Sequence, residues 1–162
     1  QLVQVIKKLN QGTNMKNTPL KGGTDFFIGA VVAPEADPWE PEMIKFEKKI
    51  EAGAKFFQTQ AIYDMEKFHK FYEYAKKFDV KILGGILLLK SAKMAHFLND
   101  NVPGVTVPKY FIDELEKSKD QLEKGIEIAA KQIKELKGFC DGAHIMAIGQ
   151  EESVVNIIEA AG

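Results

Sequence analysis

The sequence predicts an α/β fold in which short buried strands alternate with amphipathic helices. Four short apolar runs lack a polar face, as strands covered on both sides of a parallel sheet do. They lie at residues 25–32, 56–57, 80–89 and 142–148. Apolar residues recur at helical spacing between these runs. Repeated strand–helix units require a parallel sheet with right-handed crossovers, and we expect residues 1–162 to form a single domain of this kind.

Two parallel architectures fit this order of elements, a doubly wound sheet and part of a (β/α)8 TIM barrel. No Gly-x-Gly-x-x-Gly follows the first strand, which disfavours a doubly wound dinucleotide-binding domain. Four strands are too few to close a barrel, whose typical length is about 250 residues. Gln1 falls inside an amphipathic pattern. We therefore favour part of a barrel and expect the chain to be a fragment of a longer polypeptide.

The first third of the chain predicts a helix, a loop, a strand and a second helix. Residues 1–10 have an amphipathic pattern, and the polar residues 13–23 indicate a loop. Residues 25–32 are apolar and rich in aromatic and β-branched residues, which predicts a buried strand. Pro41 can take the first position of the next helix. The core-facing stripe of that helix is Met43, Phe46, Ile50 and Ala54.

The next strand carries the polar residue that we consider most informative. Gly53 ends the preceding helix, and Phe56 and Phe57 begin a buried strand. Polar residues then interrupt the apolar run and end at Gln60. Because ligands bind at the carboxyl ends of parallel strands, we predict that Gln60 is a ligand-facing amide. The alternative is a Gln that satisfies backbone groups at the strand end.

The second half of the chain repeats the strand–helix pattern. Asp64 can cap the helix after the second strand, and Ser91 can cap the helix after the strand at 80–89. Residues 102–108 form a short extended segment bounded by prolines, and two helices follow it. The last strand, at 142–148, precedes a closing helix. The second of the two helices that follow residues 102–108 has a strong 3.6-residue repeat, formed by Leu122, Ile126, Ala129, Ala130, Ile133 and Leu136.

The composition is that of an ordinary globular protein and argues against a nucleic-acid binder, a metal site and a membrane protein. The net charge of -1 disfavours a nucleic-acid binder, which would carry a basic excess. The sequence contains no Arg, so anions must be bound by Lys or helix N-termini. One cysteine and three scattered histidines do not form a metal site. We expect solvated roles for His69 and His96 and a structural role for the buried His144. No apolar run is long enough to span a membrane and no signal-peptide pattern is present, so we expect a cytoplasmic protein.

At residues 51–60 the chain resembles a known family. The run EAGAKFFQTQ, followed by Asp64, resembles the EAGA…TQ…D signature of flavin-dependent methylenetetrahydrofolate reductases. Further segments resemble that family in the same order. They are residues 27–35 (FIGAVVAPE), 85–87 (GIL), 102–108 (VPGVTVP) and 142–146 (GAHIM). The resemblance implies a (β/α)8 barrel of which this chain is roughly the C-terminal half, strands five to eight, without the family's catalytic Glu.

The resemblance also implies roles for individual residues. Gln60 matches the Gln that hydrogen-bonds the pterin ring of the folate, and Gln150 lies where some members direct an Arg toward the substrate's glutamate tail. Four residues match positions that face the flavin. Lys49 corresponds to a Lys near the phosphates, although without the family it would be taken for a solvated helix lysine. Glu42 corresponds to an Asp at the ribityl or ribose hydroxyls, and Ala33 and Asp37 replace a Tyr and a His.

The activity that follows from this resemblance is the flavin-mediated reduction of 5,10-methylenetetrahydrofolate to 5-methyltetrahydrofolate. FAD is the expected cofactor, with FMN as an alternative. The electron donor would be NAD(P)H or a redox partner subunit, in an oligomer or larger complex. Two other functions fit the sequence: a non-catalytic barrel subunit or scaffold in such a complex, and a pterin-dependent methyltransferase barrel.

Overall fold

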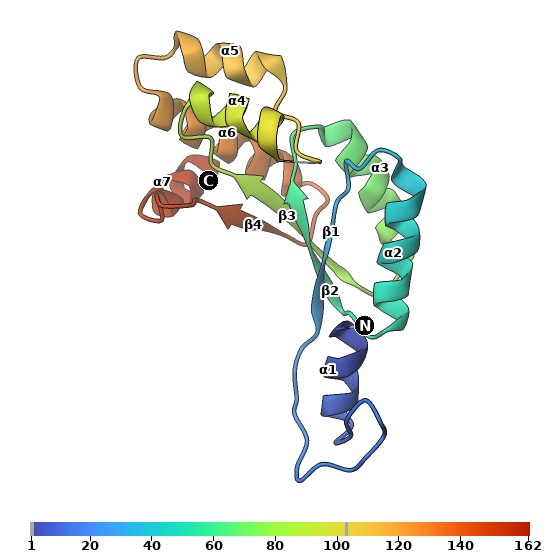
Figure 1. Cartoon of the computed structure of the whole chain (residues 1–162). Coiled ribbons are helices and arrows are strands. Elements are labelled where there is room, and N and C mark those ends of the chain that lie inside the picture. Colours follow the sequence, from blue (N-terminus) through green and yellow to red (C-terminus); the bar gives the residue numbers. More distant parts are fainter. Residues whose placement is uncertain (1, 103) are drawn as a thin grey trace.

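The computed structural model describes residues 2–102 and 104–162, which form four strands and seven helices (Figure 1). The strands are β1 (Gly29–Val32), β2 (Phe56–Ala61), β3 (Lys81–Leu87) and β4 (Gly142–Met146). The helices are α1 (Leu2–Asn10), α2 (Trp39–Glu51), α3 (Met65–Ala75), α4 (Ala92–Asn101), α5 (Lys109–Lys117), α6 (Gln121–Leu136) and α7 (Ser153–Ala161). None of these helices is long and apolar enough to cross a bilayer.

The strands form one parallel sheet in the order β1-β2-β3-β4. Successive βα units that place each new strand beside the previous one produce this order. Figure 1 shows α2 and α3 beside β1 and β2, with α1 and the loop after it extending beyond the sheet. The predicted α/β fold with a parallel sheet is therefore confirmed. The described strands form an open sheet, so the closed barrel and the assignment to its C-terminal half remain predictions.

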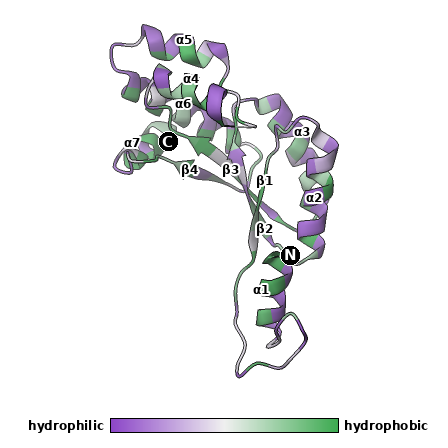
Figure 2. Cartoon of the chain, viewed as in Figure 1, coloured by the Kyte–Doolittle hydropathy of each residue, from purple (hydrophilic) through white to green (hydrophobic). Residues whose placement is uncertain are grey.

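A large apolar core lies between the sheet and the helices that cover one of its faces. Phe46 of α2 packs against Phe57 of β2 with ring centroids 4.5 Å apart, and both are fully buried. Ile86 of β3 and Ile133 of α6 belong to the same cluster. In Figure 2, α2, α3 and α6 alternate between hydrophilic and hydrophobic residues, as amphipathic helices packed on a sheet do.

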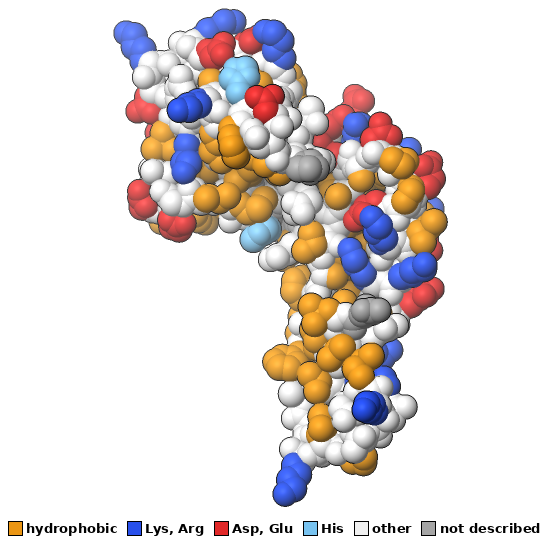
Figure 3. All heavy atoms as spheres, viewed as in Figure 1, with side chains coloured by type: hydrophobic (Ala, Val, Ile, Leu, Met, Phe, Trp, Pro, Cys, Tyr) orange, Lys and Arg blue, Asp and Glu red, His pale blue; other side chains and the backbone are white. Residues whose placement is uncertain are grey.

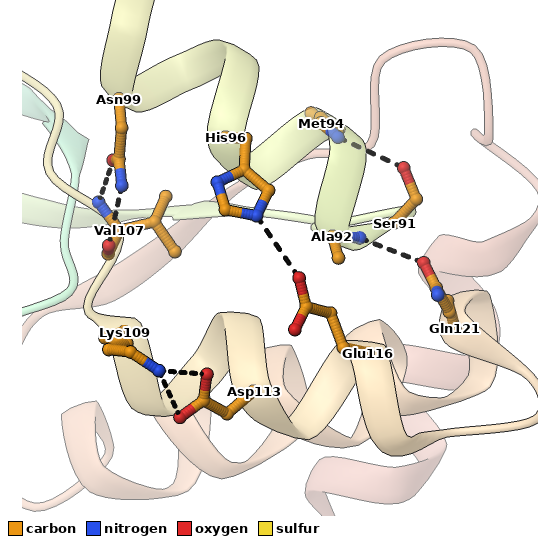
Figure 4. Close-up of polar contacts among 10 residues, drawn as sticks. All are labelled: Ser91, Ala92, Met94, His96, Asn99, Val107, Lys109, Asp113, Glu116 and Gln121. Atoms are coloured by element: carbon orange, nitrogen blue, oxygen red, sulfur yellow. Dashed lines mark hydrogen bonds and ion pairs between the residues drawn. The ribbon is translucent and has the colours of Figure 1, made fainter.

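A second apolar cluster lies at the carboxyl ends of the central strands. It joins Ala61 and Leu87 to Val107 in the extended segment and to Phe111 of α5. Asn99 of α4 holds that segment in place, because its side chain donates to the Val107 carbonyl at 3.0 Å and accepts from the Val107 N–H at 2.7 Å (Figure 4). Residue 103 of the predicted extended segment lies outside the described residues.

The predicted caps of two helices are confirmed. The Asp64 side chain accepts a hydrogen bond from the N–H of Lys67 at 3.0 Å, and α3 begins at the next residue, Met65. The hydroxyl of Ser91 accepts from the N–H of Met94 at 3.1 Å at the start of α4 (Figure 4). Both contacts satisfy N–H groups that have no partner within the helix.

The prediction for the first strand was wrong in extent. The strand was expected over residues 25–32, but β1 begins at Gly29, and Phe26 and Phe27 are 55% and 72% exposed. Gly29 pairs with Phe56, the first residue of β2, and the Ile28 carbonyl accepts from the Lys55 N–H at 2.7 Å. Within the described residues no strand pairs with Phe26 or Phe27. Phe27 instead stacks on the half-buried ring of Phe56 at 5.4 Å. Apolar composition alone could not reveal where the neighbouring strand begins.

The expected start of the second helix was also wrong. Pro41 was predicted at its first position, but α2 begins at Trp39 after Pro38, so Pro41 is the third helical residue. A proline is tolerated there because the N–H groups of the first helical turn have no partner within the helix. The predicted helix over residues 1–10 is observed as Leu2–Asn10, and residue 1 lies outside the described residues.

Candidate functional site

The side chains of β2 alternate between the helix-covered face and the opposite face of the sheet. Phe57 and Thr59 are buried, whereas Gln60 is exposed. We call the side of β1 and β2 that carries Gly29, Val31, Phe56 and Gln58 the open face. We assign the exposed Gln60, which lies within a register shift of the sheet, to the same side. In the described part of the chain no helix covers it, and Figure 3 shows hydrophobic side chains gathered over β1 and the loop before it. Gln60 thus lies at the carboxyl end of β2, where the sequence predicted an amide.

An irregularity in the sheet sets the position of Gln60. The pairing of β2 with β3 shifts register between Gln58 and Ala61. The hydroxyl of Thr59 bonds to both strands at this shift. It accepts from the Gly85 N–H and donates to the Gln60 carbonyl, both at 2.8 Å. A Cβ on Gly85 would lie 2.5 Å from the Thr59 carbonyl oxygen. The close approach that shapes the end of β2 therefore requires glycine at position 85.

Three groups hold the residues that follow Gln60. The N–H of Ile62 donates to the Gly85 carbonyl at 2.9 Å. The buried Gln132 of α6 donates to the Ile62 carbonyl at 2.7 Å. Glu35, in the loop after β1, accepts the N–H groups of Tyr63 and Asp64 at 2.6 and 2.8 Å. The end of β2 is therefore fixed from the sheet, from α6 and from the first loop.

Glu35 was not among the site residues predicted from the sequence. The half-buried carboxylate lies between two loops at the carboxyl ends of β1 and β2. Burial raises the pKa of Glu35, and the N–H groups of Asp64 and Tyr63 oppose this shift. Burial, together with the charge of Glu35, also raises the pKa of Tyr63. An acidic residue three positions after a predicted strand was the available signal, but its partners lie 28 and 29 residues away.

Two of the residues predicted to face the flavin contact the backbone of β1. The ammonium of Lys49 donates to the Val31 carbonyl at 2.6 Å, and Glu42 accepts from the Ala33 N–H at 3.3 Å. Glu42 also pairs with Lys45 at 3.3 Å. Val31 and Ala33 are two residues apart, so their backbone groups point to the same edge of β1. Lys49 and Glu42 of α2 therefore lie along the edge of β1 that faces away from β2.

The remaining predicted residues lie in loops at the carboxyl ends of the strands. Ala33 directly follows β1 and is half-buried, and Asp37 is exposed in the same loop. Gln150 is half-buried in the turn between β4 and α7. Because the carboxyl ends of parallel strands lie at the same end of the sheet, these residues lie at the same end of the sheet as Gln60. No hydrogen bond within the described residues joins Gln150 to Gln60, and the roles of all these residues remain predictions.

The histidines lie away from the end of β2 or within the sheet. His69 and His96 are exposed, as expected, and His96 approaches Glu116 of α5 at 3.3 Å (Figure 4). Lys109 and Asp113 form an ion pair on the same surface at 2.7 Å. His144 is half-buried in β4, where it pairs in register with Gly85.

The comparisons with known proteins agree with the resemblance found in the sequence. The model of the family "Methylenetetrahydrofolate reductase" matches residues 1–162. Methylenetetrahydrofolate reductase 2 of Saccharomyces cerevisiae is 28% identical over 154 residues, which cover 86% of this chain and 25% of that protein. The 5,10-methylenetetrahydrofolate reductase of Buchnera aphidicola is 26% identical over 157 residues, which cover 88% of this chain and 52% of the relative.

A solved structure gives the same result. An uncharacterized protein from Clostridium thermocellum, which binds two copies of 5-methyl-5,6,7,8-tetrahydrofolic acid, superposes with a TM-score of 0.60 at 25% identity. The match covers 85% of this chain and 53% of that protein, so the chain spans about half the length of this neighbour and of the Buchnera relative, and a quarter of the yeast protein. On the match over all its residues, the chain belongs to the methylenetetrahydrofolate reductase family.

Proposed function

We propose that this chain is the C-terminal part of a flavin-dependent barrel that reduces 5,10-methylenetetrahydrofolate to 5-methyltetrahydrofolate. The observation that carries the proposal is the exposed amide of Gln60 at the carboxyl end of β2, in a chain of this family. A structural neighbour that binds 5-methyltetrahydrofolate supports a folate as the ligand.

Gln60 has the chemistry needed to orient a pterin. A primary amide offers two N–H donors and a carbonyl acceptor in one plane, which complements the amide-like edge of the ring. Its position on the open face leaves these groups accessible, while the Thr59–Gly85 contact fixes the backbone behind it. Gln150, at the end of β4, would lie toward the glutamate tail. In this proposal the residues of this chain align the substrate and do not supply the acid of the reaction.

The residues present fit one part of a flavin site. Lys49 and Glu42 place a cation and a carboxylate along one edge of β1, and the exposed Asp37 lies in the loop beyond it. Such groups suit the phosphates and hydroxyls of FAD, with FMN as the alternative, and the small side chain of Ala33 would face the ring. A bound flavin would supply the hydride chemistry. Lys49 would exchange its contact with the Val31 carbonyl for phosphate oxygens.

The electron donor is NAD(P)H or a redox partner subunit, the protein works as an oligomer or within a complex, and it is cytoplasmic. A non-catalytic scaffold is the second candidate. The exposed apolar side chains of Phe26, Phe27 and Val31 favour it, because large exposed apolar patches mark interaction surfaces.

A redox titration of the purified native protein tests the catalytic proposal. Its visible spectrum should show bound flavin, and anaerobic addition of 5-methyltetrahydrofolate should bleach the flavin absorbance as the cofactor takes up the hydride. The same addition to protein stripped of flavin serves as the control. A protein with no flavin absorbance that nevertheless forms a stable complex with a redox subunit would support the scaffold instead.

A further inference from the structure

Between Gln60 and α3, the backbone of Tyr63 and Asp64 is bonded to Glu35 and not to the sheet. Ile62 is the last residue after β2 whose N–H bonds to β3, through the Gly85 carbonyl. The next two N–H groups, of Tyr63 and Asp64, both donate to one carboxylate oxygen of Glu35. Tyr63 is 3% exposed, so its N–H has little access to water. Among the described residues, this oxygen is the acceptor that satisfies both groups.

The same contact joins two loops that the proposed function places around the ligands. Glu35 lies two residues after Ala33 and two before Asp37, in the loop predicted to face the flavin. Tyr63 and Asp64 lie three and four residues after Gln60, and Asp64 also caps α3. A carboxylate that accepts two short backbone bonds forms a strong, directional link. A displacement of either loop is therefore transmitted to the other.

We propose that Glu35 is a positioning residue that fixes the amide of Gln60 relative to the loop after β1, and so sets the affinity for the pterin. This inference rests on the proposed function. Glu35 acts through the backbone of Tyr63 and Asp64, without contact with the reacting atoms. Its removal should weaken folate binding while leaving the fold in place, because the large core around Phe46 and Phe57 does not include it.

Asp141 provides a matched control at the opposite end of the sheet. Its carboxylate accepts the N–H of Ile82 at 2.9 Å and pairs with Lys81 at 2.9 Å, at the amino ends of β3 and β4. Asp141 and Glu35 thus make the same kind of contact, a carboxylate bonded to the backbone of a neighbouring strand or loop. Only Glu35 lies at the ligand-binding end. A purely structural role would give Glu35→Ala and Asp141→Ala similar effects.

The experiment compares Glu35→Ala, Glu35→Gln and Asp141→Ala in the complete native protein. Titration with 5-methyltetrahydrofolate should show Kd raised about tenfold or more in Glu35→Ala, because two charge-assisted bonds are lost. Glu35→Gln, which keeps an oxygen acceptor, should restore most of the affinity, and Asp141→Ala should match the wild type. Amide hydrogen exchange should speed up at Tyr63 and Asp64 in Glu35→Ala and not in Asp141→Ala.

The outcomes separate this inference from the proposed function. If the wild type binds no folate, the proposed function fails, and the exchange at Tyr63 and Asp64 still decides whether Glu35 fixes this segment. If the wild type binds folate but Glu35→Ala keeps its affinity, or if Asp141→Ala loses as much, Glu35 is not a positioning residue. Unchanged exchange at both N–H groups in Glu35→Ala would also overturn the inference.

Discussion

At the scale of the residue, Gln60 presents its amide on the open face while its backbone is bonded to Thr59. We predict that Gln60→Ala raises the Kd for 5-methyltetrahydrofolate about tenfold, since hydrogen bonds of about 1 kcal/mol each are lost. The free energy of unfolding should change little because the side chain is exposed. Isothermal titration calorimetry of the native protein measures the Kd, and urea unfolding measures the free energy of unfolding.

Gln58 supplies the control for this prediction. It lies on the same face of β2, one alternation closer to the amino end of the strand. Gln58→Ala should bind 5-methyltetrahydrofolate like the wild type. Equal losses of affinity in both variants would show that the open face, and not the amide at position 60, determines binding.

The buried carboxylate of Glu35 predicts a specific dependence of stability on pH. Burial raises its pKa above the usual 4.5, so the folded protein binds this proton more tightly than the unfolded chain does. The wild type should therefore gain free energy of unfolding relative to Glu35→Gln as the pH falls from above the raised pKa to 4.5, and the gain should be absent at higher pH. Urea unfolding of both proteins at several pH values measures this difference. A gain that grows with rising pH instead would mean that the two N–H bonds outweigh burial.

At the scale of the element, the helices depend on local contacts that the sequence reveals. Ser91 caps α4 through the Met94 N–H. We predict that Ser91→Ala lowers the free energy of unfolding by about 1 kcal/mol, because an N–H of the first turn loses its partner. Ser91→Asp, which keeps a capping oxygen, should stay close to the wild type in the same denaturant titration. A loss in Ser91→Asp equal to that in Ser91→Ala would assign the effect to packing.

Local signals explain which elements could be predicted. The caps at Asp64 and Ser91 and the strand before Gln60 follow from short sequence patterns, and the structure has them. The start of β1 depends on where β2 begins, 27 residues later, so the apolar run at Phe26 and Phe27 was misleading.

In the candidate site, too, some features follow from short sequence patterns and others depend on contacts between residues far apart in the chain. Gln60 could be placed at a strand end because the polar residue follows an apolar run. The contact of Glu35 with Tyr63 and Asp64 joins two loops, and no spacing within either loop indicates it. The backbone contacts of Lys49 and Glu42 likewise depend on how α2 packs against β1.

At the scale of the whole molecule, the open sheet leaves apolar side chains uncovered in the described part of the chain. Phe27 is 72% exposed beside the open face. We predict that residues 1–162 alone self-associate through this face, since exposed apolar patches favour association. Phe27→Asp should shift the sedimentation coefficient toward that of a monomer without loss of helical circular dichroism.

The comparable substitution on a helix is the control for this surface. Phe97 is likewise exposed, at 58%, but it belongs to α4 and not to β1 or the loop before it. Phe97→Asp should leave the sedimentation of residues 1–162 unchanged. A wild-type chain that is monomeric at every concentration, or an equal effect of both substitutions, would remove the open face as the site of association.

We propose that the amide of residue 60 binds the edge of a pterin at the carboxyl end of β2. A crystal structure of the native protein with 5-methyltetrahydrofolate would show whether this contact forms. We predict that the pterin lies over the open face with its ring nitrogens or carbonyl within hydrogen-bond distance of the Gln60 amide. A pterin bound at any other surface, with Gln60 left in solvent, would show that Gln60 does not orient the pterin.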